Sequence, residues 1–227
     1  MFLSVIFEEI KTFINKIIKH THKEGYVYIF ISFILLAFGF MISTILGFVI
    51  LILSMWCIYF FRDPERVINT DENIISSPAD GVIVDISKRV PPSEIGINEE
   101  MQKISIFLNV FNVHVNRSPV AGIIEKVIYH KGKFLNAGVD KASEENERNT
   151  LVIDSKNGKI AVVQIAGLIA RRIICDVSSN QNISAGERYG IIKFGSRVDI
   201  YIPLTFDIKV LKGQSMVGGE TTIAAKK

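Results

Sequence analysis

The sequence has few of the residues that usually indicate a disulfide framework, a metal centre or a nucleic-acid surface. It has two cysteines, Cys57 and Cys175, without Cys-x-x-Cys spacing, so we expect neither a disulfide framework nor a metal site. The formal net charge is only +3 with both signs interspersed, which argues against nucleic acid as a partner. No glycine-rich nucleotide motif is present, and no lysine stands in an environment typical of cofactor attachment.

Charged residues and histidine are absent from residues 25–61, a run of 37 residues. One helix needs only ~20 apolar residues to cross a bilayer, so two short crossings fit this run better than one long helix. We place them at about Tyr26–Met41 and Ile45–Phe61. Small residues suited to a turn lie between or near them: Gly39, Ser43, Thr44 and Gly47.

The flanks of this apolar run indicate its topology. No small-x-small cleavage site follows it, which argues against a secretory signal. Basic residues precede and follow it, and the positive-inside tendency then places both ends on the cytoplasmic face of the cell membrane. Apolar residues at helical spacing over residues 3–17 predict an amphipathic helix, which either lies in the membrane interface or packs on the soluble domain. We therefore assign residues 1–61 to a membrane anchor.

Residues 62–227 are predicted to form a mainly β domain, which makes the whole chain α+β. Short β-branched runs bounded by Gly, Pro, Asn or Asp are typical of strands. Repeated turn-Gly-strand segments resemble the hybrid sandwich of lipoyl and biotinyl carrier domains, so a sandwich-like arrangement is expected. The predicted strands are 74–75, 82–86, 104–110, 123–129, 150–154, 160–165, 173–177, 189–194, 198–202 and 206–210.

Four short motifs follow one another along the chain. The apolar run ends in Phe-Phe-Arg-Asp-Pro-Glu-Arg at 60–66, and Ser-Ser-Pro-Ala-Asp-Gly follows at 76–81. Asn-Val-His-Val-Asn-Arg-Ser-Pro occupies 112–119, and Lys-Phe-Gly-Ser-Arg-Val-Asp occupies 193–199. Taken together and in this order, the four motifs resemble those of the short-form phosphatidylserine decarboxylases. The resemblance extends from Phe60 to the C-terminus.

This resemblance implies a self-processing precursor. The bond between Gly195 and Ser196 would be cut, giving chains 1–195 and 196–227 that stay associated, and Ser196 would become a covalent pyruvoyl cofactor. That group would form a Schiff base with phosphatidylserine in the lipid bilayer, and loss of CO₂ would yield phosphatidylethanolamine. A pyruvoyl group supplies the electron sink that ordinary side chains lack.

The same resemblance suggests roles for individual residues. Ser196 needs a base and the base needs an orienting group, and His114 and Asp80 match the family's histidine and aspartate motifs. His114 is expected to serve both self-cleavage and later proton transfer. Five further residues lie in stretches resembling the family's substrate side, although a solvated basic surface is the alternative for the cations: Lys133, Phe134, Asn136, Arg148 and Arg171.

Two other functions compete with this interpretation. A membrane adaptor with a carrier-type sandwich would explain the apolar run and the repeated glycine-strand pattern, but not the three motifs of the soluble domain. A serine hydrolase using Asp80, His114 and Ser196 is the other alternative, although Ser196 lacks a Gly-x-Ser-x-Gly elbow. Only the decarboxylase hypothesis predicts two fragments under denaturing conditions.

Overall fold

The structure is a computed structural model that describes residues 19–134, 145–168, 172–193 and 195–227. The chain divides into two compact units, Met1–Glu65 and Arg66–Lys227. The amphipathic helix predicted over residues 3–17 lies outside the described residues.

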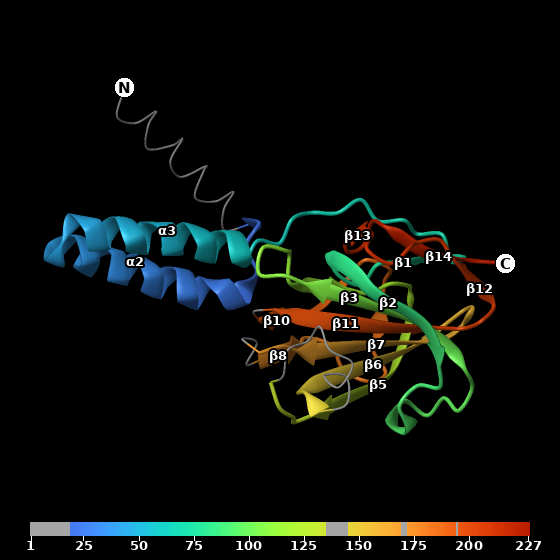
Figure 1. The fold of residues 1–227 in the computed structure, drawn as a ribbon. Coiled ribbons are helices and arrows are strands. Elements are labelled where there is room, and N and C mark those ends of the chain that lie inside the picture. Colours follow the sequence, from blue (N-terminus) through green and yellow to red (C-terminus); the bar gives the residue numbers. More distant parts are fainter. Residues whose placement is uncertain (1–18, 135–144, 169–171, 194) are drawn as a thin grey trace. The chain divides into compact units, whose positions relative to one another are not determined.

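The first unit contains a helical hairpin (Figure 1). A short 3₁₀ turn η1 (Lys23–Gly25) leads into α2 (Tyr26–Ile42), and α3 (Thr44–Phe60) runs back beside it. Ser43 alone separates the helices, with an extended backbone at φ −160° and ψ 139°. Three of the four helix ends differ from the predicted ones, each by one residue. Two short helices with a turn between them are therefore present as predicted, whereas their crossing of a membrane stays a prediction.

Small residues let the two helices of the hairpin approach closely. Gly39 and Gly47 lie within the helices rather than in the turn, and a Cβ at Gly39 would lie 2.5 Å from Ile50 Cδ1. Ser54 Oγ donates to Ile50 O at 2.8 Å. Small residues are the usual means by which apolar helices pack against one another in a bilayer.

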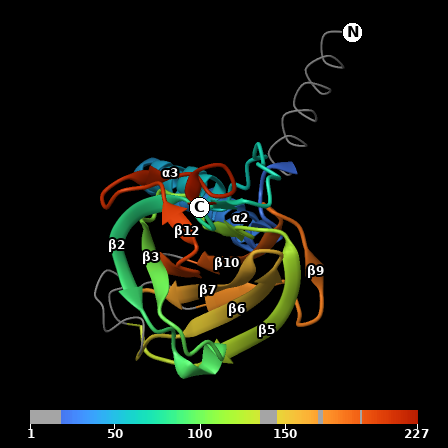
Figure 2. The same ribbon diagram turned by 90° about the vertical axis from the view of Figure 1, so that its right-hand side faces the viewer.

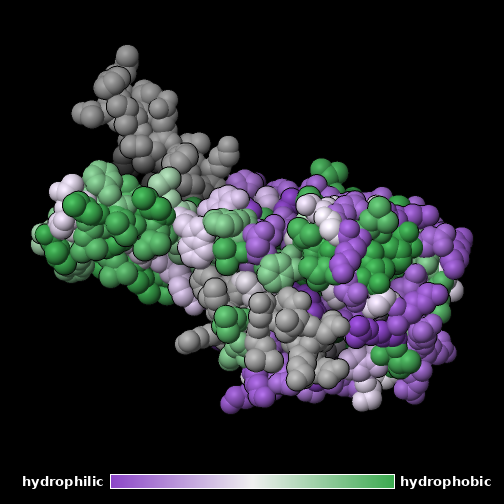
Figure 3. Space-filling model, in the orientation of Figure 1, coloured by the Kyte–Doolittle hydropathy of each residue, from purple (hydrophilic) through white to green (hydrophobic). Residues whose placement is uncertain are grey.

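The surface of the hairpin is apolar (Figure 3). The segment Lys23–Ile42 is long and apolar enough to cross a membrane, whereas Thr44–Phe60 is shorter, at 17 residues. Large apolar side chains point outward from both helices, for example Phe30 and Met41 of α2 and Ile45 of α3. The base of the hairpin is closed by backbone hydrogen bonds from His22 N to Phe61 O and from Asp63 N to His20 O.

The second unit is mainly β, with all its paired strands antiparallel, and has three sheets among the described residues. The main sheet has eight strands in the order β13-β2-β3-β11-β7-β6-β5-β9. Two three-stranded sheets have the orders β1-β14-β12 and β4-β10-β8. A 3₁₀ turn η2 (Ser93–Ile95) follows β2. The strands are β1 (Ile74–Ser76), β2 (Gly81–Arg89), β3 (Met101–Leu108), β4 (Val115–Arg117), β5 (Gly122–His130), β6 (Arg148–Ser155), β7 (Gly158–Ala166), β8 (Arg172–Cys175), β9 (Asn182–Ile183), β10 (Arg188–Lys193), β11 (Ser196–Ile202), β12 (Phe206–Ile208), β13 (Ser215–Met216) and β14 (Thr222–Lys226).

The main sheet curls into a half-barrel (Figure 2). All ten predicted strands are present, so the expectation of a mainly β domain is confirmed, whereas a two-sheet sandwich is not. Four short strands, β4, β9, β13 and β14, were not predicted. One large apolar core joins the main sheet to both small sheets, and a second, smaller core covers its other face.

Candidate active site

The register of the main sheet brings the predicted site residues to one end of it. β11 begins with Ser196, which pairs with Leu108 at the end of β3 and with Ala166 at the end of β7. β2 begins at Gly81, directly after Asp80, and Val82 pairs with Phe107 of β3. His114 follows the end of β3, and Lys133 and Phe134 follow the end of β5. We call this end of the sheet the site rim.

Ser196 is fully buried, and its Oγ has no hydrogen-bond partner among the described residues. Its strand neighbours on both sides, Leu108 and Ala166, are also fully buried and apolar. Gly195 has a φ of +53°, in the left-handed region that disfavours residues with a Cβ. Apart from its chain neighbours, no described residue has an atom within 4 Å of the position a Cβ would take at Gly195, so glycine is favoured there by backbone conformation rather than by lack of space.

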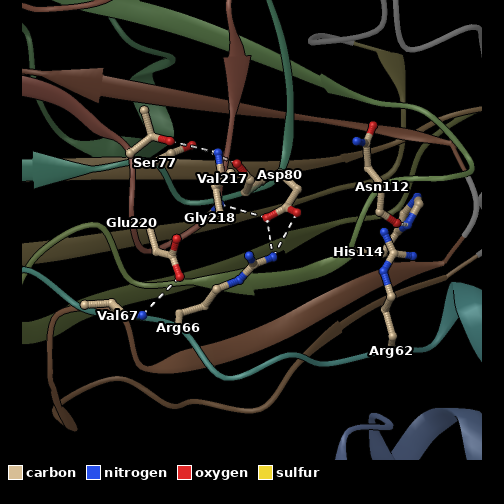
Figure 4. Close-up of polar contacts among 12 residues, drawn as sticks. Arg62, Arg66, Val67, Ser77, Asp80, Asn112, His114, Val217, Gly218 and Glu220 are labelled. Carbon is tan, nitrogen blue, oxygen red and sulfur yellow. Dashed lines mark hydrogen bonds and ion pairs between the residues drawn. The ribbon is translucent and has the colours of Figure 1, made fainter.

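His114 is placed beside the strand that leads to Ser196. Its carbonyl accepts a hydrogen bond from Ile192 N at 3.3 Å, near the end of β10, four residues before Ser196. The imidazole is buried, and Nδ1 lies 2.9 Å from Asn112 O (Figure 4). With a proton on Nδ1 donated to that carbonyl, Nε2 is the nitrogen left to act as a base.

Asp80 is held by contacts that sequence analysis did not predict. Its two carboxylate oxygens accept from Arg66 Nη2 at 3.0 and 2.9 Å, and Oδ1 also accepts from Gly218 N at 2.8 Å (Figure 4). Two backbone hydrogen bonds between Ser77 and the segment 219–221 complete this junction. Asp80 therefore ties the 77–80 turn to the C-terminal 32 residues, and its predicted role in orienting His114 stays a prediction.

The residues expected on the substrate side have different surroundings. Lys133 is highly exposed and pairs with Glu145 at 3.0 Å. Arg148 is more enclosed and donates to Glu94 through Nε and Nη2, both at 3.2 Å. Phe134 packs partly buried against the main core. Asn136 and Arg171 lie outside the described residues.

A chain of buried amides on the face of Ser196 was missed by sequence analysis. Asn149 Nδ2 donates to Gln164 Oε1 at 3.0 Å, and Gln164 Nε2 donates to Asn116 Oδ1 at 2.9 Å. All three side chains are buried, and Gln164 pairs with Val198, two residues from Ser196 on the same face of β11. A glutamine among apolar residues in the strand 160–165 was the visible signal, but its partners come from distant strands.

A buried charge cluster lies on the opposite face of β11. Asp199 accepts from Arg197 Nη2 at 2.9 Å, and Lys103 Nζ of β3 lies 3.2 Å from Asp199 Oδ2. All three side chains are almost completely buried. Burial, and next the charge of Asp199, raises the pKa of Tyr201, so this phenol stays neutral beside them. We call Lys103, Arg197 and Asp199 the charged cluster.

Comparisons with known proteins show the family of this chain. The family model for phosphatidylserine decarboxylase matches residues 53–224. A phosphatidylserine decarboxylase proenzyme from Ehrlichia chaffeensis is 53% identical over 209 residues, which are 91% of this chain and 92% of the relative. The chain belongs to the phosphatidylserine decarboxylase family, as the motifs predicted.

Proposed function

We propose that this chain is a precursor that cuts itself between Gly195 and Ser196 and then decarboxylates phosphatidylserine to phosphatidylethanolamine. The observation that carries the proposal is the structure around the bond between Gly195 and Ser196. A buried serine hydroxyl in an apolar setting directly follows a glycine with positive φ, at the end of the sheet where His114 also lies. The name of the Ehrlichia relative, a decarboxylase proenzyme, supports both the cleavage and the substrate.

The cleavage uses only groups of the chain and one water molecule. Ser196 Oγ loses its proton to His114 Nε2 and bonds to the carbonyl carbon of Gly195, while the peptide C–N bond breaks and its nitrogen is protonated. Removal of the Cα proton of Ser196 then breaks the Cβ–Oγ bond and frees the Gly195 carboxylate. Hydrolysis releases the nitrogen as ammonia and leaves a pyruvoyl group at the start of the small chain.

The surroundings of Ser196 fit such a group. Pyruvoyl is small and uncharged, and the strand neighbours Leu108 and Ala166 are buried and apolar. Such a group would supply a ketone for the substrate's amine and an electron sink for the loss of CO₂. β3 and β7 would hold the first residue of the small chain in place, and His114 would donate the proton that replaces CO₂.

The contacts of residues 196–227 support continued association of the two chains. β11 is paired along its length with β3 and β7, β14 pairs with β1, and β13 pairs with β2, all across the proposed cut. Seven large side chains of the small chain belong to the main core: Val198, Ile200, Ile202, Phe206, Val210, Met216 and Ile223. At ~1.5–3 kcal/mol each, their burial gives roughly 10–20 kcal/mol as an upper bound.

The helical hairpin supports the membrane part of the proposal. A diacyl lipid does not leave the bilayer to reach a soluble enzyme, and the outward apolar side chains of α2 and α3 suit a lipid environment. We propose that the hairpin inserts from the cytoplasmic face of the cell membrane, with both ends on that side. The family match argues against the adaptor, and a serine hydrolase would retain Ser196 as serine.

The test combines activity with detection of the ketone. Purified full-length protein in phosphatidylserine vesicles should release CO₂ and form phosphatidylethanolamine, and a hydrazide probe should label the chain that begins at residue 196. Ser196→Ala should do neither. Activity with no hydrazide label on this chain would contradict the proposed pyruvoyl group. Label without activity on phosphatidylserine would contradict the proposed substrate.

A further inference from the structure

Two exposed apolar side chains stand on either side of the cleavage serine at the site rim. Beyond Leu108, the β3–β4 loop presents Phe111, which is 61% exposed. Beyond Ala166, on the other side of Ser196, the chain presents Leu168, which is 67% exposed. Leu108 and Ala166 are the two strand neighbours of Ser196, so both apolar side chains lie a few residues beyond the strand ends that flank it.

The turn that carries Phe111 is held by its own hydrogen bonds. Asn109 N donates to Asn112 Oδ1 at 2.9 Å, Asn112 N donates to Asn109 O at 3.0 Å, and Phe111 N donates to Asn109 Oδ1 at 2.8 Å. These bonds hold an aromatic side chain outward on a closed turn. The carbonyl of Asn112, in the same turn, faces Nδ1 of His114 at 2.9 Å. The exposed aromatic residue and the buried histidine therefore share one hydrogen-bonded segment.

Cations accompany these two side chains at the same end of the sheet. Lys131 and Lys133 follow the end of β5, and Arg172 begins β8 after the segment that carries Leu168. All three are exposed, with Lys133 paired to Glu145. Exposed apolar side chains with lysine or arginine beside them are typical of surfaces that sit in the interface of an anionic bilayer.

We propose that Phe111 and Leu168 form a membrane contact of the catalytic unit, inserting on either side of the Ser196 site into a bilayer that contains anionic lipid. The inference rests on the proposed function and adds a second contact to the helical hairpin. A lipid headgroup can reach Ser196 with its acyl chains still in the bilayer only if the site rim faces the membrane. The two side chains fix that orientation, and the exposed cations at the same end of the sheet favour the anionic substrate.

Fluorescence quenching tests the contact without requiring activity. Trp56 is the only tryptophan, so a Trp56→Phe background allows one probe to be placed at position 111. In vesicles of brominated phosphatidylcholine with a minor fraction of phosphatidylserine, the Phe111→Trp probe should be strongly quenched. A Val90→Trp probe is the matched control, because Val90 is 59% exposed and follows Arg89 at the opposite end of β2. Equal quenching, or its absence at both positions, would overturn the proposal.

Kinetics separates membrane contact from support of His114. The double variant Phe111→Ser/Leu168→Ser should lower kcat/KM about tenfold or more on bilayer phosphatidylserine, since two apolar side chains would no longer be buried. On a monomeric short-chain phosphatidylserine its kcat/KM should stay within about twofold of the parent. Val90→Ser should change neither value. Equal losses on both substrates would assign Phe111 to the structure of the site and contradict the proposal. Quenching of the probe at position 111 in a protein that never cleaves would support the membrane contact and contradict only the decarboxylase function.

Discussion

The two faces of strand β11 are both buried but carry different chemistry. One face presents Ser196, Val198, Ile200 and Ile202 to the large core, and all four lie within apolar surroundings apart from the amide chain. The other face presents Arg197, Asp199 and Tyr201, where charges are paired within the protein. The alternation of a strand lets consecutive residues of one motif serve different purposes. The first face suits the reaction, and the second suits adhesion between the two proposed chains.

The energetics of the two faces differ in kind. On the face that carries Ser196, a neutral hydroxyl is buried with no hydrogen-bond partner among the described residues, which costs ~1–3 kcal/mol but leaves the nucleophile unengaged. On the other face Lys103 would belong to the large chain, and Arg197 and Asp199 to the small one. Removing one member of a buried ion pair costs ~3–5 kcal/mol because a charge is left alone. Substitutions on the first face should therefore affect cleavage, and those on the second should affect retention of the small chain.

The largest effect is expected from Ser196→Ala, which should abolish cleavage and activity together because neither the ester nor the ketone can form. Ser105→Ala is the matched control. Ser105 is also buried, and its Oγ has no hydrogen-bond partner in the described part of the chain, but it pairs with Asp199 on the other face. Its precursor should still be cut. Denaturing gels measure the cleavage of both variants. A Ser196→Ala protein that is still cleaved would contradict the assignment of cleavage to the face that carries Ser196.

The second-largest effect is expected from His114→Ala, which removes the proposed base. Processing should slow by about 10²–10⁴-fold, the usual contribution of a positioned general base. His130→Ala is a useful control, because His130 is also at the site rim but lies 3.2 Å from Glu94. The half-life of the precursor after synthesis measures both. A native rate for His114→Ala would assign the base to another residue.

The smallest effects on cleavage, and the largest on association, are expected in the charged cluster. Asp199→Asn should leave cleavage in place but lower the free energy of unfolding by about 3–5 kcal/mol, because two buried cations lose their partner. Lys103→Met should cost less, since the pair between Arg197 and Asp199 remains. Denaturant titration and co-elution of the two chains measure these effects. Slower cleavage of Asp199→Asn without a loss of stability would contradict the different roles given to the two faces of β11.

Local patterns in the sequence predicted the helices and strands of the fold, but not the contacts between distant segments. The helices of the hairpin were predicted closely, because 37 uncharged residues and a small-residue turn are local signals. The strands were predicted from their β-branched runs. The contacts that site residues make with distant segments were not predicted. Arg66 and Gly218 reach Asp80, and Glu94 engages Arg148, only through contacts between distant segments. The short strand β4 was also missed, because three residues carry too little periodicity.

The central claim is tested most directly by the intact mass of the purified full-length protein under denaturing conditions. The account predicts two chains, residues 1–195 and residues 196–227, the second beginning with a pyruvoyl group that blocks Edman degradation. Their summed mass should equal that of the precursor plus one water minus one ammonia. A single uncut chain that still decarboxylates phosphatidylserine, or a small chain that begins with an intact serine, would contradict the account.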